Sequence, residues 1–192
     1  MEGTVREKIL SACIRLFNEK GCRFTLDDLV EALKISRKTF YRYFLNKEDV
    51  LKAIIDEMHA AVYPLQCALY NNEALPTEEK LFRALTLRLP YEDDIDLARI
   101  YELEQYYPDV YAYFMGVYAQ GWALTELLLR QGMAEGVFRA ENVELVRAMI
   151  ENAMKMLYQG DFLARSHLAY HDALEQAVRI ILRGIHREAG SC

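Results

Sequence analysis

The sequence lacks the features that mark several large classes of protein. Its 192 residues include only 4 cysteines, 4 prolines and 9 glycines. The cysteines are far apart and form no C-x-x-C pair, which argues against a disulfide framework or a zinc module and favours a reducing compartment. Apolar residues make up 53% of the chain, which excludes a disordered or low-complexity protein. We therefore expect an ordered, globular protein with ample material for a buried core.

Targeting segments and catalytic motifs are also missing. The first ten residues, MEGTVREKIL, have no apolar stretch like that of a signal peptide, and no run approaches the roughly 18 apolar residues of a membrane-spanning helix. The chain has no G-K-[ST], H-E-x-x-H, G-x-S-x-G or G-x-G-x-x-G motif. His167 and His171 stand four residues apart, but two histidines alone do not make a metal site. The sequence thus predicts a cytoplasmic protein that is not an enzyme, holds no cofactor or metal and does not enter a membrane.

Charge is distributed unevenly along the chain. The formal net charge of −6 argues against a protein that coats nucleic acid with its whole surface. Residues 1–50 carry 10 Lys and Arg against 8 Asp and Glu (+2), and the rest carry 13 against 21 (−8). Residues 33–47, LKISRKTFYRYFLNK, contain five basic residues and no acidic one. A local surface for nucleic acid is therefore compatible with an acidic chain.

Apolar residues recur at helical spacing, and no segment shows the alternation of a strand. A helix is expected over residues 5–17, with Gly21 as its stop, and a short second helix begins after Thr25, which has Asp28 three residues later. The spacing predicts further helices after Ser36 and Asn46, the latter over 47–58, and over 109–130, 141–160 and 172–185. Beyond Pro64 the pattern stays helical, with breaks at 71–77, 90–94, Pro108, Gly132, Gly136 and near Gly160.

The basic segment has the composition of a helix-turn-helix. Behind Ser36, a third helix would bury Phe40, Tyr43 and Phe44 and expose Arg, Lys, Thr and Tyr side chains. Such a helix presents donors to base edges while its flanks hold phosphates. The alternative is a solvated basic face without a partner.

Residues 25–51, TLDDLVEALKISRKTFYRYFLNKEDVL, resemble the N-terminal DNA-binding segment of TetR-family transcriptional repressors. The resemblance covers about residues 5–55 and includes FNEKG upstream, the T-x-D-D start, S-[RK]-K-T-x-Y-x-Y-F and K-E-x-[VL]. The later chain matches in length, helical character and the segment AEGVFR (134–139). Two departures are Lys34, where the turn usually carries glycine, and a loop between Gly21 and Thr25 that is one residue shorter than is common.

The resemblance implies an all-α protein with an N-terminal three-helix helix-turn-helix DNA-binding domain, residues 1–46, and a C-terminal helical ligand-binding and dimerisation domain, residues 47–192. Arg37, Lys38 and Thr39 are expected to face the major groove. The remaining expected DNA contacts are phosphate contacts by Thr25, Tyr41, Tyr43 and Lys47, with Lys34, Ser36 and Arg42 completing the basic and polar surface. Core packing remains the alternative for Tyr43.

Aromatic residues are concentrated between Tyr91 and Trp122. In the resembling family the corresponding helices enclose the inducer pocket, and ordinary core packing is the alternative. Near Glu102, Glu104 and Asp109, such a lining would suit a flat or cationic lipophilic ligand. The candidate ligand contacts are Tyr101, Tyr107, Tyr113, Phe114, Tyr118 and Trp122.

The last two helices are apolar on more than one side, since Met154, Met156, Tyr158, Ile180 and Leu182 lie opposite their main apolar faces. We therefore expect a homodimer formed through these helices. The resulting hypothesis is a repressor that binds a palindromic double-stranded DNA operator and is released by a small lipophilic or aromatic inducer. A ligand-independent architectural DNA-binding protein, or a small-molecule-binding or metabolic protein with a vestigial helix-turn-helix, is the alternative.

Overall fold

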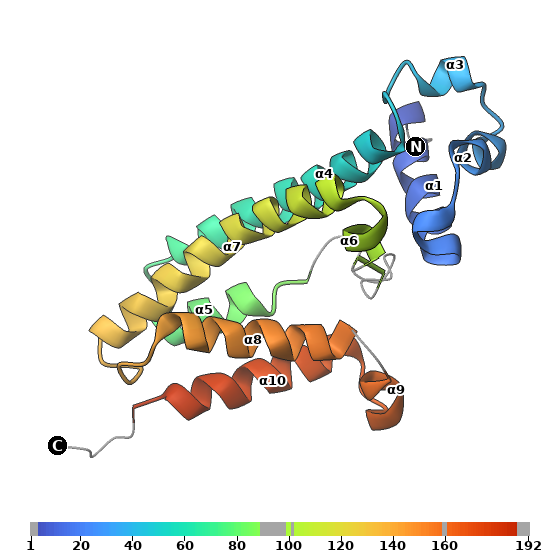
Figure 1. Cartoon of the computed structure of the whole chain (residues 1–192). Coiled ribbons are helices and arrows are strands. Elements are labelled where there is room, and N and C mark those ends of the chain that lie inside the picture. Colours follow the sequence, from blue (N-terminus) through green and yellow to red (C-terminus); the bar gives the residue numbers. More distant parts are fainter. Residues whose placement is uncertain (1–3, 89–98, 101, 159–160, 188–192) are drawn as a thin grey trace. The chain divides into compact units, whose positions relative to one another are not determined.

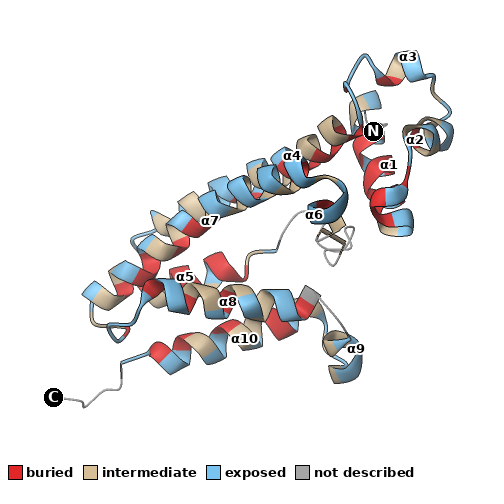
Figure 2. Cartoon of the chain, viewed as in Figure 1, coloured by how far each residue is buried: buried red, intermediate tan, exposed pale blue. Residues whose placement is uncertain are grey.

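The computed structural model describes residues 4–88, 99–100, 102–158 and 161–187, which form helices joined by turns (Figure 1). Within these ranges, extended backbone pairs only at one isolated bridge, between Phe138 and His186. Most of the helices have buried positions on one side and exposed positions on the other (Figure 2), as the helical spacing of apolar residues requires. The all-α prediction is confirmed.

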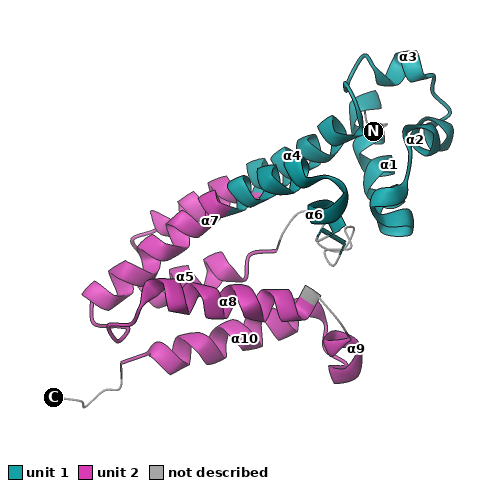
Figure 3. Ribbon diagram, viewed as in Figure 1, with its two compact units in different colours: residues 1–61, 89–118 teal, residues 62–88, 119–192 magenta. Residues whose placement is uncertain are grey.

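The chain divides into two compact units, which are described separately (Figure 3). Unit 1 comprises residues 1–61 and 89–118, and unit 2 comprises residues 62–88 and 119–192. The two units are defined by which residues pack together. The expected boundary at residue 46 instead separates a DNA-binding from a ligand-binding region, and it stays a prediction.

Unit 1 contains the N-terminal helices and parts of two longer ones. A single core joins them, in which Ile9, Leu29, Phe40 and Val50 are completely buried. Its elements are α1 (Val5–Lys20), the 3₁₀ turn η1 (Gly21–Arg23), α2 (Leu26–Leu33), α3 (Arg37–Phe40), α6 (Glu102–Tyr106) and the first parts of α4 (Lys47–Tyr70) and α7 (Pro108–Ala134).

Helix α4 is longer than the sequence predicted, because it continues through Pro64 to Tyr70. Proline removes one backbone donor and leaves the carbonyl of residue 60 without its usual partner. Both Ala60 and Pro64 are exposed, so water can reach that carbonyl, while Val62 stays buried on the opposite side. Pro64 therefore does not end the helix.

In unit 2, helix α10 packs against α8 and α5. Leu81, Leu129, Phe138 and Ile150 are fully buried there. The elements of unit 2 are α5 (Thr77–Leu85), α8 (Val143–Tyr158), α9 (Phe162–Ser166), α10 (Tyr170–Ile185) and the later parts of α4 and α7. Among the helices that the structure describes, none is long and apolar enough to cross a membrane.

The turns after α4 and α7 fall near their expected places. Helix α7 ends at Ala134, and Gly136 follows in a conformation with φ of 75° that favours glycine. The short helices α6 and α9 were not predicted, since five residues carry too little periodicity to show in a sequence. The expected breaks at 90–94 and Gly160 lie outside the described residues.

Candidate functional site

A capping box starts α2. The Asp28 amide donates to Oγ1 of Thr25 at 3.1 Å, and the Thr25 amide donates to Oδ2 of Asp28 at 2.6 Å. The Lys20 ammonium lies 2.6 Å from Oδ1 of Asp28. This ammonium and the amide and hydroxyl of Thr25 lower the pKa of Asp28 to about 2. The predicted N-cap is thus present, and Thr25 stays exposed at the start of the helix.

The turn between α2 and α3 is left-handed at Lys34, with φ of 54° and ψ of 39°. The Lys34 amide donates to the carbonyl of Glu31, and the Ile35 amide donates to that of Val30. A non-glycine residue in this conformation costs about 1 kcal/mol relative to glycine. The lysine therefore keeps the conformation that glycine would favour and adds a positive charge to the exposed surface.

Helix α3 is a single turn that begins after Ser36, whose Oγ accepts a hydrogen bond from the Thr39 amide at 3.0 Å. Phe40 and Phe44 are buried beneath it. Tyr43 is exposed, so its expected place in the core is wrong, and the phosphate role stays a prediction. The exposed side chains of this segment are those of Ser36, Arg37, Lys38, Tyr41, Arg42 and Tyr43, with Thr39 partly exposed.

Arg37 is paired within the helix-turn-helix. Its Nε and Nη2 donate to Oδ1 of Asp27 at 2.9 and 2.6 Å, and Nη2 also lies 2.7 Å from Oδ2. The carboxylate raises the pKa of Arg37 further, so the guanidinium stays charged. The pair joins the first turn of α2 to the first residue of α3.

Lys47 lies elsewhere than the phosphate role requires. Only 9% of the residue is exposed, and its Nζ donates to the carbonyls of Cys22 at 2.9 Å and Phe24 at 2.6 Å. Nζ also lies 3.7 Å from the centre of the Phe24 ring and 4.8 Å from that of Tyr107. The ammonium is thus part of the core of unit 1 and is not free to hold a phosphate.

Helix α6 contacts the turn between α1 and α2. The Cys22 amide donates to Oε2 of Glu102 at 3.0 Å, and Arg99 pairs with the same carboxylate at 3.4 Å. Burial raises the pKa of Cys13 to about 12, and burial and Glu102 raise that of Cys22 to about 11. Both thiols are therefore protonated at neutral pH and unsuited to nucleophilic chemistry.

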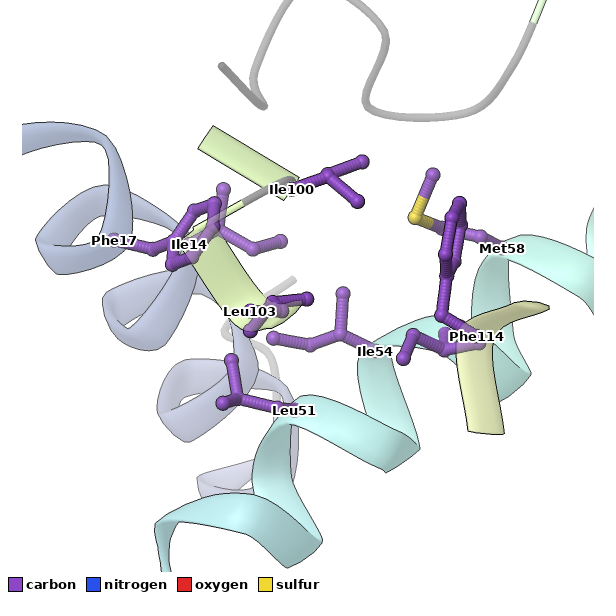
Figure 4. Close-up of a pocket in the computed structure, with 9 residues that line it drawn as sticks. Ile14, Phe17, Leu51, Ile54, Met58, Ile100, Leu103 and Phe114 are labelled. Carbon is purple, nitrogen blue, oxygen red and sulfur yellow. The ribbon is translucent and has the colours of Figure 1, made fainter. Parts of the chain in front are cut away.

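A small cavity of about 50 Å³ lies inside unit 1. In Figure 4 the side chains around it present carbon atoms and the sulfur of Met58. Helices α1, α4, α6 and α7 all contribute to its wall. It is lined by Ile14, Phe17, Leu51, Ile54, Ile55, Met58, Ile100, Leu103 and Phe114.

Of the predicted aromatic ligand contacts that the structure describes, only Phe114 lines this cavity. Tyr118 stacks on Phe114 with ring centres 5.9 Å apart, and the Tyr113 hydroxyl donates to Asp56. Tyr107 lies beside Lys47, as described above. Trp122 is buried in unit 2, where the Arg147 guanidinium lies 5.2 Å from its ring centre, and Tyr101 lies outside the described residues.

The residues that line the cavity, apart from Phe114, were not predicted as ligand contacts. Ile54 and Met58 were recognised as the apolar face of a helix, but the spacing of such a face is the same beside a cavity as in a packed core. No signal in the sequence would have separated the two.

Helices α8 and α10 of unit 2 carry exposed apolar side chains. Ile180 is 71% exposed, and Leu145, Met149 and Met156 are about half exposed. We call these four residues the apolar patch. Of the residues expected opposite the main apolar faces of the last two helices, Met156 and Ile180 are exposed, as a partner surface would require. Leu182 is buried, and the side chain of Tyr158 lies outside the described part.

Comparison with known proteins agrees with this arrangement. The family described as bacterial regulatory proteins, tetR family, matches residues 9–54. An uncharacterised HTH-type transcriptional regulator of Bacillus subtilis strain 168, YvaF, is 25% identical over 180 residues, which cover 93% of this chain and 94% of YvaF.

Solved structures share the fold over nearly the whole chain. The fatty acid degradation regulator FadR from Bacillus halodurans is 23% identical, with a TM-score of 0.74 over 97% of this chain and 100% of FadR. The transcriptional regulator FadR from Bacillus subtilis, in complex with stearoyl-CoA, is 18% identical, with a TM-score of 0.71 over 94% of this chain and 99% of that one. Residues 9–54 thus match the DNA-binding segment of the tetR family of bacterial regulatory proteins, and the chain shares its fold with these solved regulators over nearly its whole length.

Proposed function

We propose that the chain is a dimeric repressor whose release from a palindromic operator is controlled by a lipophilic small molecule. The observation that carries the DNA-binding part is the exposed polar and basic surface of α3 and the turn after it. Its backbone is fixed from below by Phe40 and Phe44 and at its start by the Ser36 cap. Side chains held in this way can meet base edges with little loss of conformational freedom.

Within that surface, each residue type suits one kind of contact. Arg37 and Lys38 carry donors for O6 and N7 of guanine, and Thr39 follows them on the same turn. Exposed Tyr41 and Tyr43 can donate to phosphates, as can the backbone at the starts of α2 and α4. Lys34, Ser36 and Arg42 add charge and donors around these positions.

The apolar patch supports the dimer. Four large side chains exposed on α8 and α10 would be costly to leave in water and suit an isologous contact with the same helices of a second copy. Two recognition helices set about 34–36 Å apart would then read successive major grooves of a palindrome.

The cavity supports a ligand with a hydrocarbon part. The described side chains of the lining are all apolar, and such a lining favours methylene chains over a charged or flat aromatic ligand. The B. subtilis FadR structure, which contains stearoyl-CoA, gives a precedent in a protein of the same fold. As it stands, the cavity of about 50 Å³ is far below the roughly 300 Å³ that a drug-sized ligand needs.

A ligand entering this cavity would therefore have to widen it. Ile14 and Phe17 of α1 form part of the wall and also belong to the core that holds Leu29 and Phe40 of the helix-turn-helix. Widening would disturb that core, so the ligand would favour a state with weaker DNA binding. A ligand-independent architectural protein would instead show no rise of its melting temperature with any acyl compound.

The proposal is tested by a mobility-shift assay with the DNA upstream of the protein's own gene. Binding should weaken as salt rises, because neutralised phosphates release counterions. Addition of a long-chain acyl-CoA should release the DNA and raise the melting temperature of the free protein. Absence of salt-sensitive binding at low ionic strength would contradict the regulator proposal.

Replacing Arg37 by Ala should weaken binding to the preferred DNA about tenfold and affect unrelated DNA much less, because a bidentate contact to guanine discriminates by about 1–3 kcal/mol. Binding is measured by fluorescence anisotropy on both duplexes. Arg15→Ala removes an exposed arginine from α1 and serves as the charge-matched control. Equal losses on both duplexes would show that Arg37 contacts phosphates only.

Replacing Ile180 by Lys should raise the dimer dissociation constant at least tenfold, because it places a charge in the proposed apolar contact. Sedimentation equilibrium over a range of protein concentrations measures the constant. Leu45→Lys changes an even more exposed apolar residue, in unit 1 and outside the apolar patch, and should leave the dimer intact. If both variants stay dimeric, the interface lies elsewhere.

A further inference from the structure

The pair of Asp27 and Arg37 contributes little to the stability of unit 1. Their side chains are 64% and 62% exposed, and ion pairs in water at such exposure are nearly neutral for folding. The helices that they join are already fixed by other contacts. Helix α2 has its capping box and buried Leu29, and α3 has the Ser36 cap and buried Phe40. The presence of this ion pair is therefore not explained by a need to stabilise the fold.

The geometry of the pair limits how the guanidinium can be oriented. Arginine has five N–H donors along two usable edges, one formed by Nε and Nη2 and the other by Nη1 and Nη2. The Asp27 carboxylate takes the first edge, with three donor–acceptor distances between 2.6 and 2.9 Å. It makes no hydrogen bond to Nη1. The second edge stays open for another pair of acceptors.

Guanine offers such a pair. Its O6 and N7 lie side by side in the major groove and accept two parallel hydrogen bonds from one arginine edge. An arginine that is free to rotate loses side-chain entropy when it forms both bonds, whereas one already held by a carboxylate loses less. It also cannot swing easily toward a phosphate, because the carboxylate holds its plane.

We propose that Asp27 is a positioning residue that holds Arg37 for reading a guanine and so sets base specificity without touching DNA. The inference rests on the proposed role of Arg37 in contacting a base. An alternative role for Asp27, in which its charge opposes DNA binding, predicts the opposite effect of removing it. If its charge merely repelled phosphates or withheld Arg37, removing it would tighten binding to every sequence alike.

The experiment uses the full-length protein and a library of random duplex DNA. Selection with the unchanged protein identifies its preferred sites, and selection with Arg37→Ala identifies the position whose guanine preference disappears. Affinities are then measured on two duplexes that differ only at that position, for the unchanged protein, Asp27→Ala and Asp27→Asn. Glu31→Gln is the control, because it removes another exposed carboxylate from the same helix.

Asp27→Ala should reduce the preference for guanine at that position about fivefold, while Glu31→Gln leaves the preference unchanged. Asp27→Asn should fall between the two, since its amide oxygen still accepts from the guanidinium with a weaker bond. Melting temperatures of the variants should match that of the unchanged protein, which separates positioning from a structural role.

An unchanged guanine preference in Asp27→Ala, or a uniform gain on all duplexes, overturns the inference and leaves the role of Arg37 standing. If Arg37→Ala alters no position, the proposed base contact fails, and the role of Asp27 fails with it. If the unchanged protein selects no sequence at all, the operator-binding function itself is contradicted.

Discussion

Replacing Lys47 by Met is expected to lower the free energy of unfolding by about 3 kcal/mol, because buried acceptors that lose their donor cost about 1–3 kcal/mol each. Methionine fills nearly the same space but leaves the carbonyls of Cys22 and Phe24 without the ammonium that now binds both. The contact with the Phe24 ring, at 3.7 Å, is lost as well. Relief from burying the ammonium offsets only part of this cost.

Urea unfolding followed by far-UV circular dichroism, at one fixed protein concentration, measures the change. Lys8→Met is the matched control, since it removes an exposed lysine from α1 and should alter stability by less than about 0.5 kcal/mol. Equal stability of the two variants would mean that the Lys47 ammonium is not held in the core.

Replacing Gly132 by Ala should destabilise unit 2 by about 2–3 kcal/mol through overpacking. An added Cβ would lie 2.5 Å from Cε2 of the Phe138 ring and closer still to Cδ2. Phe138 is fully buried, so its ring has no open space to move into. The methyl group therefore forces either the ring or the end of α7 out of place.

Gly116→Ala provides the control on the same helix. Apart from its chain neighbours and the backbone of its own helix, no atom lies within 4 Å of its added Cβ, so the better helix propensity of alanine should stabilise the protein by about 0.5–1 kcal/mol. Combining Gly132→Ala with Phe138→Leu should cost less than the sum of the single changes, since the smaller side chain makes room. Additive costs in this double-mutant cycle would show that the two residues do not clash.

The sequence predicted the local structure of the helix-turn-helix well. Thr25, Ser36 and Asn46 each cap a helix where expected, because a cap depends on residues only three positions apart. The predicted turn at Lys34 is left-handed even without glycine. Such features are set by neighbours in the chain and can be inferred without knowing the tertiary structure.

The features that the sequence did not predict, which are the burial of individual side chains and the lining of the cavity, depend on tertiary packing. Lys47 and Arg37 are cations in one basic segment, yet one is buried under η1 and the other stands in solvent. Tyr43 and Phe44 are adjacent aromatics with opposite exposure. Among the described residues of the predicted aromatic set, the cavity takes only Phe114, because its other walls come from apolar residues of helices far apart in the sequence, including Phe17 of α1.

The shared wall of the cavity has a consequence for how this protein can evolve. Ile14 and Phe17 face the cavity and also support the helices proposed to meet DNA, so a substitution there that reshapes the cavity should also alter the packing beneath the helix-turn-helix. Ligand preference should therefore diversify among descendants mainly at Met58, Ile100 and Phe114, which pack only at the edge of that core. Under the proposed function, the α1 side of the cavity should change slowly, because both DNA binding and ligand binding would depend on it.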